Sequence, residues 1–359
     1  MQGKRSDLRA AVEAALGCEA EGLEDVRSEA LDYDAFLAHR TVRRIHGRAR
    51  VDGGCRPWSL IEKTTEGPEL AERYLLDNGA REFAAYSSGL LDGLAPSVRA
   101  PRLYGSRAGD GGRLVLWLEE VAHDGARPLD AVSLLAAARD LGAMAGSWHR
   151  RVPAERWLFG GWIDRHSQPE AVPAGLAALS TVNREVVALL GTRLAAGRAL
   201  VAAQPRVRAI LESLPQTLCH HDAVGANVFV SSGTTVLIDW ESVGPGAVGA
   251  DLASLLFSSV RRGDAMASVV ASVLDSAVSA YTESVREQDP SVSAKDVRRG
   301  FDAAVALRWK LIADLADAAE RQRPIRRGSR PDEPARESLG ELVALADLLL
   351  DAAHRALDH

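Results

Sequence analysis

Three polar side chains about two-thirds of the way along the chain have the types and spacing that phosphoryl transfer requires. Asn227 follows Asp222 by five positions, and Asp239 follows Asn227 by twelve, at the end of an apolar run. A carboxylate can orient an attacking hydroxyl and take its proton. An amide oxygen and a second carboxylate can hold the magnesium ions that bridge nucleotide phosphates. The set therefore favours magnesium-dependent phosphoryl transfer.

A loop followed by a hairpin would bring these three side chains together. Apolar runs at 228–230 and 236–238 flank the turn residues 231–233, which predicts a short hairpin. Such a hairpin returns Asp239 to face the loop before it. The H-x-D-x-x-x-x-N spacing arises often by chance, so the joint pattern of loop, hairpin and apolar strand carries the interpretation.

The elements on either side of this segment differ in kind. Up to about residue 120 the pattern predicts a small antiparallel sheet with one inserted helix, and from there helices dominate except between residues 215 and 251. Asp130 is expected to cap a helix that runs to about residue 150. Strands are predicted at 40–50, 57–64, 101–106 and 114–118, and helices at 8–17, 69–92, 170–213 and beyond 252.

Bulk properties exclude several classes of protein. A chain of 359 residues can form two lobes, and its net charge of −6 argues against a general nucleic-acid binder. No run of about 18 apolar residues is present, and the N-terminal stretch lacks the apolar core of a secretory signal. Three scattered cysteines predict no disulfide framework, which favours a reduced, cytoplasmic setting.

The segment CHHDAVGANVF, followed by LIDWESVGPGAVGADLA, resembles the aminoglycoside phosphotransferase and choline kinase superfamily of small-molecule kinases. There the loop usually reads like HGDLHPGN and the strand ends in IDWE. The resemblance implies an α+β, bilobal protein-kinase-like fold with a small antiparallel five-stranded N-lobe and a larger helical C-lobe. Residues 1–120 would form the nucleotide-binding lobe, and residues 121–359 the catalytic and acceptor-binding lobe.

The resemblance also assigns roles to individual residues. Asp222 looks like the catalytic base, and Asn227 and Asp239 look like magnesium ligands. Lys63 resembles the strand lysine that grips the α- and β-phosphates of ATP or GTP, and Glu82 resembles the helix glutamate that pairs with it. Two other glutamates on the same predicted helix, Glu69 and Glu72, leave that last choice open.

Further positions match the superfamily outside this set. The stretch 114–121 resembles the linker between lobes, so the backbone near Glu119 and Val121 would bind a purine base. His220 resembles a histidine that braces the catalytic loop, and Asp251 resembles an aspartate with the same bracing role.

Two segments depart from the superfamily pattern. The loop over the nucleotide phosphates should lie near Asp32–His39, which contains no glycine to let backbone amides approach phosphate closely. The choice between ATP and GTP is therefore open. Residues 223–226 lack a basic side chain that could help neutralise the transferring phosphoryl group, and His221 replaces the usual glycine.

The sequence favours an acceptor without strong positive charge. Between residues 151 and 215 basic residues exceed acidic ones by three, whereas a polycationic aminoglycoside would favour an acidic cleft. A neutral or modestly charged hydroxyl compound fits, such as a nucleoside-type or other glycosylated antibiotic or a sugar metabolite. Asp314, Asp317 and Trp309 on a late helix keep cationic acceptors open, although the same helix also reads as a buried stripe with a solvated acidic face.

Two other functions compete with an active kinase. The glycine-free loop suggests a kinase-like nucleotide-binding protein without turnover, although the retained Lys63 speaks against it. A metallohydrolase could use His220 and His221 with Asp222 and Asp239. Adjacent histidines on a strand point to opposite sides, which disfavours a shared metal.

Overall fold

The computed structural model describes residues 2–31, 40–65, 78–109, 112–125, 127–168, 172–181 and 183–358. The chain divides into two compact units. The first comprises residues 1–93, 99–123 and 236–241, and the second comprises residues 94–98, 124–235 and 242–359. Six residues that follow the catalytic loop therefore belong to the first unit.

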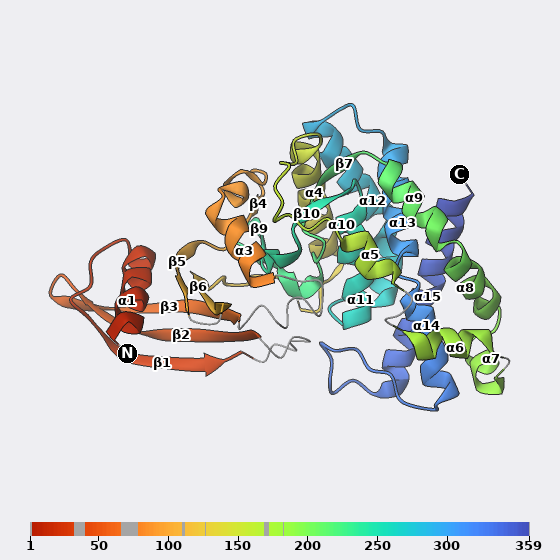
Figure 1. Cartoon of the computed structure of the whole chain (residues 1–359), viewed down its shortest axis with the longest axis horizontal. Helices are drawn as coiled ribbons and strands as arrows, with labels where there is room; N and C mark the ends of the chain where they lie inside the picture. The colour runs from red at the N-terminus through yellow and green to blue at the C-terminus, as the bar shows by residue number, and fades with distance from the viewer. Residues whose placement is uncertain are drawn as a thin grey trace. The chain divides into compact units, whose positions relative to one another are not determined.

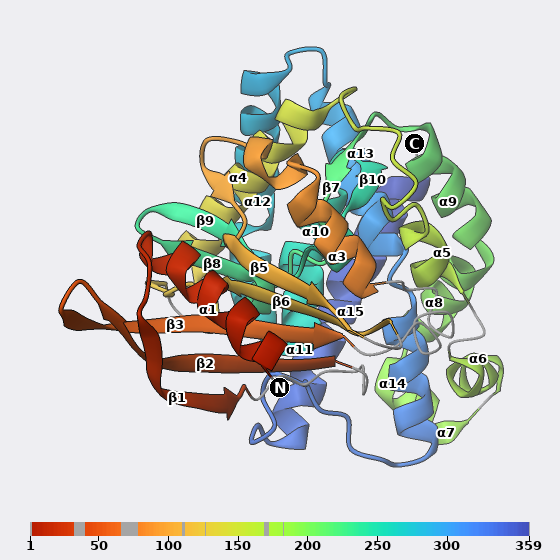
Figure 2. The same cartoon turned by 60° about the vertical axis from the view of Figure 1, so that its left-hand side comes forward.

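A five-stranded antiparallel sheet forms the first unit, in the order β1-β2-β3-β6-β5 (Figures 1 and 2). Its helix α1 (Gln2–Leu16) packs on the sheet, where Ala11 and Val12 join a core that includes Trp58 and Leu60. The remaining elements of this unit are β1 (Gly22–Ala30), β2 (Arg40–Val51), β3 (Gly54–Thr65), α3 (Asn78–Ser87), the 3-10 turn η1 (Leu90–Gly93), β5 (Leu103–Ala108) and β6 (Leu114–Glu119).

Turn chemistry fixes the register of the β2–β3 hairpin. Asp52 and Gly53 both have positive φ, +41° and +74°, as the two-residue hairpin turn requires. The pairing places Lys63 between Val42 on β2 and Leu116 on β6. Lys63 therefore lies on a central strand of the sheet, where its side chain is buried.

Helices make up most of the second unit. Asp130 caps α4 (Ala131–Trp148) by accepting a hydrogen bond from the amide of Ser133 at 2.8 Å, as predicted. The other helices are α5 (Trp162–Ser167), α6 (Pro173–Ser180), α7 (Arg184–Leu190), α8 (Arg193–Ala202), α9 (Gln204–Ser213), α10 (Ala250–Ala253), α11 (Ser259–Arg262), α12 (Ala267–Gln288), α13 (Ala294–Ala306), α14 (Lys310–Glu320) and α15 (Ala335–Leu357).

Close backbone contact joins α4 to α12. A Cβ on Gly142 would lie 2.4 Å from the carbonyl oxygen of Tyr281, and one on Gly146 would lie 2.5 Å from that of Val285. Glycine at these two positions lets the helix backbones touch, because any side chain would force them apart.

Short strands and turns interrupt the helices. β7 (Gln216–Cys219) pairs with β10 (Gly244–Ala247), and a second sheet has the order β4-β9-β8. β4 is Val98–Arg99, β8 is Val228–Ser231 and β9 is Thr234–Leu237. Ser232 and Gly233 have φ of +51° and +76°, so the predicted hairpin between β8 and β9 is confirmed.

The α+β class, the five-stranded sheet and the larger helical part are confirmed. The structure corrects details of the elements: β1 was not predicted as a strand, and the helical stretch 170–213 is divided into α6, α7, α8 and α9. The phosphate-loop prediction at Asp32–His39 and residues 69–77 of the predicted helix 69–92, with Glu69 and Glu72, lie outside the described residues. Within the part that is described, no helix is long and apolar enough to cross a membrane.

Candidate active site

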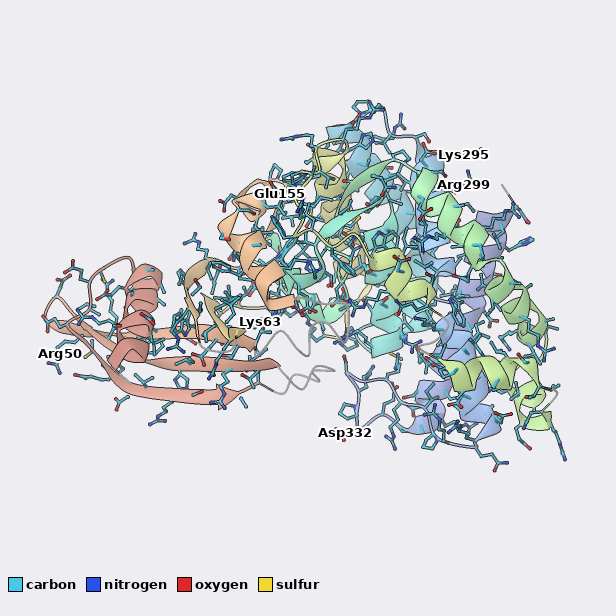
Figure 3. All side chains as sticks on the ribbon, in the orientation of Figure 1. Arg50, Lys63, Glu155, Lys295, Arg299 and Asp332 are labelled. Carbon is cyan, nitrogen blue, oxygen red and sulfur yellow. The ribbon has the colours of Figure 1, made fainter. Side chains whose placement is uncertain are left out.

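In the first unit, Lys63 forms ion pairs with two carboxylates from separate segments. Its Nζ lies 2.7 Å from Glu82 Oε2 on α3 and also donates to Asp239 Oδ1, which follows β9. The three side chains are 8%, 1% and 6% exposed. Figure 3 labels Lys63 on the sheet. The structure thus brings together three of the residues selected from the sequence.

Asp239 has a strained backbone. Its φ is +66°, in the left-handed region that non-glycine residues rarely adopt. The adjoining Trp240 is fully buried, and its indole nitrogen donates to the carbonyl oxygen of Leu237 at 2.6 Å. Such strain persists only where the surrounding structure holds it, and it is concentrated at functional sites.

In the second unit, Asn227 holds the carboxylate of Asp222. The Asn227 Nδ2 group donates to both the backbone oxygen and Oδ2 of Asp222, each at 2.9 Å. With both amide hydrogens used in this way, Oδ1 of Asn227 is the atom that can coordinate a metal. One side chain therefore orients the predicted base and offers a magnesium ligand.

Polar side chains from three other segments hold the backbone of this loop. The amide of Gly225 donates to Ser259 Oγ at 2.8 Å, and the amide of Ala226 donates to Asp264 Oδ2 at 3.1 Å. Arg127 donates to the carbonyl oxygens of Gly225 and Val228. These contacts fix the backbone path between Asp222 and Asn227 although residues 223–226 differ from the superfamily pattern.

Asp251 braces the loop through two of its backbone amides, as predicted. Its two carboxylate oxygens accept hydrogen bonds from the amides of His220 at 2.7 Å and His221 at 2.8 Å. Burial raises the pKa of the Asp251 carboxyl to about 6, although the two amides and Arg308 act in the opposite direction. His220 is fully buried, and its Nδ1 accepts the amide of Asp222 at 3.3 Å.

His221 fastens the loop to α5 and to β10. Its ring stacks on Trp162 with the centroids 4.9 Å apart, and its Nε2 lies 3.1 Å from the carbonyl oxygen of Pro245. Gly246 makes room for the ring, because a Cβ there would lie 2.5 Å from His221 Cε1. Loss of solvation lowers the pKa of the imidazole to about 3, so the ring is neutral near neutral pH.

Glu119 and Val121, in the stretch predicted to be the linker, differ in their hydrogen-bond partners. The Glu119 carboxylate binds Arg99 through two hydrogen bonds of 2.7 and 2.9 Å, and the Glu119 amide donates to the carbonyl oxygen of Arg102 at 2.9 Å. The amide of Val121 has no hydrogen-bond partner among the described residues. The Glu119 side chain thus anchors the end of β6 and leaves only backbone groups of this stretch for a base. Arg99 was not selected from the sequence, which gave no sign of this pairing.

Trp117, and Trp309 at the start of α14, are buried side chains. Trp117 is 2% exposed and Trp309 is 1% exposed. Asp317 pairs with Arg321 and Arg323, and Asp314 pairs with Arg261. Both carboxylates therefore have arginine partners, and their suggested place in a cationic acceptor site stays a prediction.

The predicted magnesium ligands fit a hard cation chemically. Magnesium prefers oxygen ligands and one or two carboxylates, and Asp239 and Asn227 supply a carboxylate and an amide oxygen. Lys63, Glu82 and Asp239 together carry a net charge of −1 when ionised, which favours a nearby cation. This set belongs to the first unit, whereas Asp222 and Asn227 belong to the second.

A second group of potential metal ligands is structural. Atoms of Cys219, His221 and Asp251 lie within 4.8 Å of one another. Burial raises the pKa of the Cys219 thiol well above its usual value, and the Asp251 oxygens and His221 Nε2 already have backbone partners. A metal would need these atoms deprotonated and unoccupied, so the group does not support the metallohydrolase alternative.

Comparisons with known proteins identify the family and the fold. The model of a phosphotransferase enzyme family matches residues 70–287. A microcompartment-associated aminopropanol kinase is 17% identical with a TM-score of 0.51, covering 93% of each chain. An aminoglycoside phosphotransferase from Alicyclobacillus acidocaldarius is 16% identical with a TM-score of 0.50, covering 91% of this chain and 94% of its own. At these identities the two structures establish the fold alone. A search of curated proteins gave no match.

Proposed function

The chain belongs to the phosphotransferase enzyme family and is a phosphotransferase that acts on a hydroxyl group of a small molecule. We propose that it transfers the γ-phosphate of ATP or GTP to this hydroxyl with the help of magnesium. The proposed acceptor is a nucleoside-type or aminoglycoside-like antibiotic or a sugar metabolite. Residues 1–120 would bind the nucleotide, and residues 121–359 would carry the catalytic loop and the acceptor site.

One observation carries this proposal: buried Lys63 is paired with both Glu82 and Asp239. A strand lysine held by a helix glutamate is the arrangement that positions nucleotide phosphates in kinases. Its second contact, to a carboxylate suited to magnesium, supports the same use. A purely structural pair would not need a third ionised side chain with a left-handed backbone.

The chain's own residues would divide the work as follows. The Asp222 carboxylate accepts the proton of the acceptor hydroxyl, and Asn227 holds that carboxylate in place through Nδ2. Lys63 donates to phosphate oxygens, and backbone groups near Glu119 and Val121 bind the base. Bound magnesium would be held by Asn227 and Asp239 and would neutralise charge on the phosphates.

A cytoplasmic location fits the proposed donor and the thiols. The three cysteines are free, and ATP and GTP are supplied in the reducing cytoplasm. If the acceptor is an antibiotic, the reaction would inactivate it inside the cell and confer resistance.

Nucleotide binding and turnover test the proposal separately. Calorimetry of ATP and GTP with and without magnesium should show metal-dependent binding that Asp239→Asn weakens by about ten-fold or more. Release of ADP or GDP with a panel of hydroxylated antibiotics and sugars measures turnover. Binding without turnover for every acceptor would instead support the kinase-like binding protein, and no magnesium-dependent binding would refute both.

A further inference from the structure

A single stretch of the second unit, residues 251–264, supplies four of the side chains that hold the catalytic loop. They are Asp251, Ser254, Ser259 and Asp264, and all are buried, from 0% to 8% exposed. Three of them accept loop amides, whereas Ser254 Oγ donates to the carbonyl oxygen of His221 at 3.3 Å. The stretch thus contacts the loop backbone on both sides of Asp222.

A π-helical turn, Ser254–Ser258, interrupts the helix between α10 and α11. In a continuous α-helix, side chains five positions apart point about 140° away from each other, because each residue turns by about 100°. In a π turn, whose hydrogen bonds join residues five positions apart, such side chains lie on nearly the same face. The π turn therefore lets Ser254 and Ser259 both face the catalytic loop.

Arg308, which follows α13, fastens this π turn. Its Nη2 donates to Ser254 Oγ at 2.8 Å, and its Nε donates to Ser258 Oγ at 3.0 Å. The guanidinium group is planar and its donors have a fixed spacing, so it holds the two hydroxyls in one geometry. Arg308 is 9% exposed, and its Nη1 donates to the carbonyl oxygen of Ala304. Because π turns are rare and often lie at functional sites, a buried arginine that holds one beside a catalytic loop indicates a role in the geometry of that loop.

The turn after α11 brings a further contact to the loop. Gly263 has a φ of +97°, and the amide of Asp264 donates to the carbonyl oxygen of Ser259 at 2.8 Å, which ends the helix. The chain reverses there, and Asp264 Oδ2 accepts the amide of Ala226. The packing is close, because a Cβ on Gly225 would lie 2.6 Å from Asp264 Cβ. Glycine has more backbone freedom than any other residue type, so the contacts to the amides of Gly225 and Ala226 restrain this part of the loop.

We propose that the π turn positions the catalytic loop for phosphoryl transfer, and that Ser259 and Arg308 are positioning residues for the base, Asp222. This inference rests on the proposed function, because it concerns the same loop. Ser259 acts through the loop amide that it accepts, and Arg308 acts through the hydroxyl of Ser254. The backbone is thereby fixed on each side of Asp222, and a displacement of about 1 Å can cost a catalytic group about 100-fold in rate.

Loss of the Ser259 hydroxyl is compared with loss of another buried hydroxyl, that of Thr282, which donates to the carbonyl oxygen of Val278 in its own helix, α12, at 2.7 Å. Release of ADP or GDP from the magnesium nucleotide is measured with water as the acceptor and with the panel of hydroxylated antibiotics and sugars. Ser259→Ala should lower the rate at saturating nucleotide by about ten-fold, the loss expected for one hydrogen bond, and change the calorimetric nucleotide affinity by less than about three-fold. Thr282→Val should keep the rate of the wild type. Rates are measured under conditions in which urea unfolding shows each variant to be folded.

Arg308 is tested by a substitution that keeps its charge. Arg308→Lys retains a cation but lacks the fork that bridges two hydroxyls, so the rate should fall by about ten-fold in the same assay. Ser254→Ala/Arg308→Lys should be no slower than the slower of its two single variants, because both substitutions break the same connection to the loop. The control Arg298→Lys changes an arginine of α13 that pairs with Asp275 and Asp302, and it should keep the rate of the wild type. Losses that multiply in the double variant would overturn the role of Arg308.

Hydrogen exchange of the loop, followed by mass spectrometry, tests the Ser259 contact without turnover. Ser259→Ala should speed the exchange of the peptide that contains Gly225 by about ten-fold, because the Gly225 amide loses its acceptor. Thr282→Val should leave the exchange of this peptide unchanged.

The outcomes separate this proposal from the function on which it rests. A Ser259→Ala protein with the rate of the wild type, or a Thr282→Val protein that is equally slow, overturns the positioning role. Unchanged exchange at Gly225, with normal turnover by the wild type, overturns it as well and leaves the proposed function intact. Absence of product release by the wild type, with water and with every acceptor of the panel, refutes the proposed function instead, and hydrogen exchange then decides by itself whether the π turn holds the loop.

Discussion

Replacing Lys63 by methionine tests whether the buried charge cluster is built around this lysine. Methionine keeps the length of the side chain and removes the ammonium group. Glu82 and Asp239 then face each other without a cation, at side-chain exposures of 1% and 6%. Glu82 already has one carboxylate oxygen, Oε1, without a hydrogen-bond partner among the described residues. Loss of the ammonium group therefore leaves two buried carboxylates without their shared cation.

The size of the effect follows from burial. Removing one partner from a buried ion pair costs about 3–5 kcal/mol, because it leaves an uncompensated charge in a medium of low polarity. An equal change at Lys295, which is exposed on α13, should alter stability by less than about 0.5 kcal/mol. Lys63→Met/Glu82→Gln should be more stable than Lys63→Met alone, because the second substitution removes one of the stranded charges.

Local unfolding in the first unit is the property to measure. Hydrogen exchange of the β3 and α3 amides, followed by mass spectrometry, reports the stability of the segments that carry Lys63 and Glu82. Lys63→Met should speed exchange there by about 100-fold or more, and Lys295→Met should leave it unchanged. A cost below about 1 kcal/mol, or a double variant that is less stable than Lys63→Met, would refute the reasoning.

Three further predictions concern pH, packing and the loop. The folded protein holds the proton of Asp251 to higher pH than the unfolded chain does, since the pKa is raised to about 6. As the pH rises from about 4 to about 6, the free energy of unfolding of the wild type should therefore fall by about 3 kcal/mol relative to that of Asp251→Asn. Urea unfolding of both proteins across this range measures the difference, and a difference that does not change with pH would contradict the prediction. Gly142→Ala should destabilise the protein by about 1–3 kcal/mol, because the added Cβ would meet the backbone of Tyr281. Gly340 on α15 has open space around it, so Gly340→Ala should stabilise the protein by up to about 1 kcal/mol in the same urea unfolding assay. Reversed signs would count against the described α4–α12 contact. His221→Gly should lower kcat by about ten-fold, because the catalytic loop loses its contact with Trp162. The shape of the pH–rate profile between about pH 5 and pH 8 should not change, because the pKa of His221 is about 3. An ionisation near pH 6 that is seen in the wild type and disappears in the variant would contradict this structural role.

The sequence predicted elements whose signals are local. Asp52 and Gly53 predict a hairpin because few residues adopt positive φ, and Asp130 predicts a helix start because its side chain accepts an amide hydrogen. The bracing role of Asp251 was also foreseen, through the resemblance of its segment to known kinases, and its two amide contacts confirm it.

The remainder depends on contacts between distant segments. Nothing in the local pattern tells that Lys310 meets the backbone of Arg165, or that Arg308 is buried beneath the catalytic loop. β1 was missed because its residues are largely exposed and polar, so its alternation is weak. Asp317 pairs with Arg321 at i,i+4, a partner that spacing does predict, whereas Asp314 looked available in sequence and yet pairs with the distant Arg261. Partners of this kind are set by tertiary packing rather than by spacing.

Turnover of Asp222→Asn tests the central claim most directly. Asparagine keeps the shape of the side chain but cannot accept the proton of an acceptor hydroxyl. With a magnesium nucleotide and a hydroxyl acceptor that the wild type phosphorylates, kcat should fall by about 10²–10⁴-fold while calorimetric affinity for the nucleotide changes by less than about three-fold. A variant that retains the rate of the wild type would contradict the assignment of Asp222 as the base, and with it the proposed phosphotransfer site.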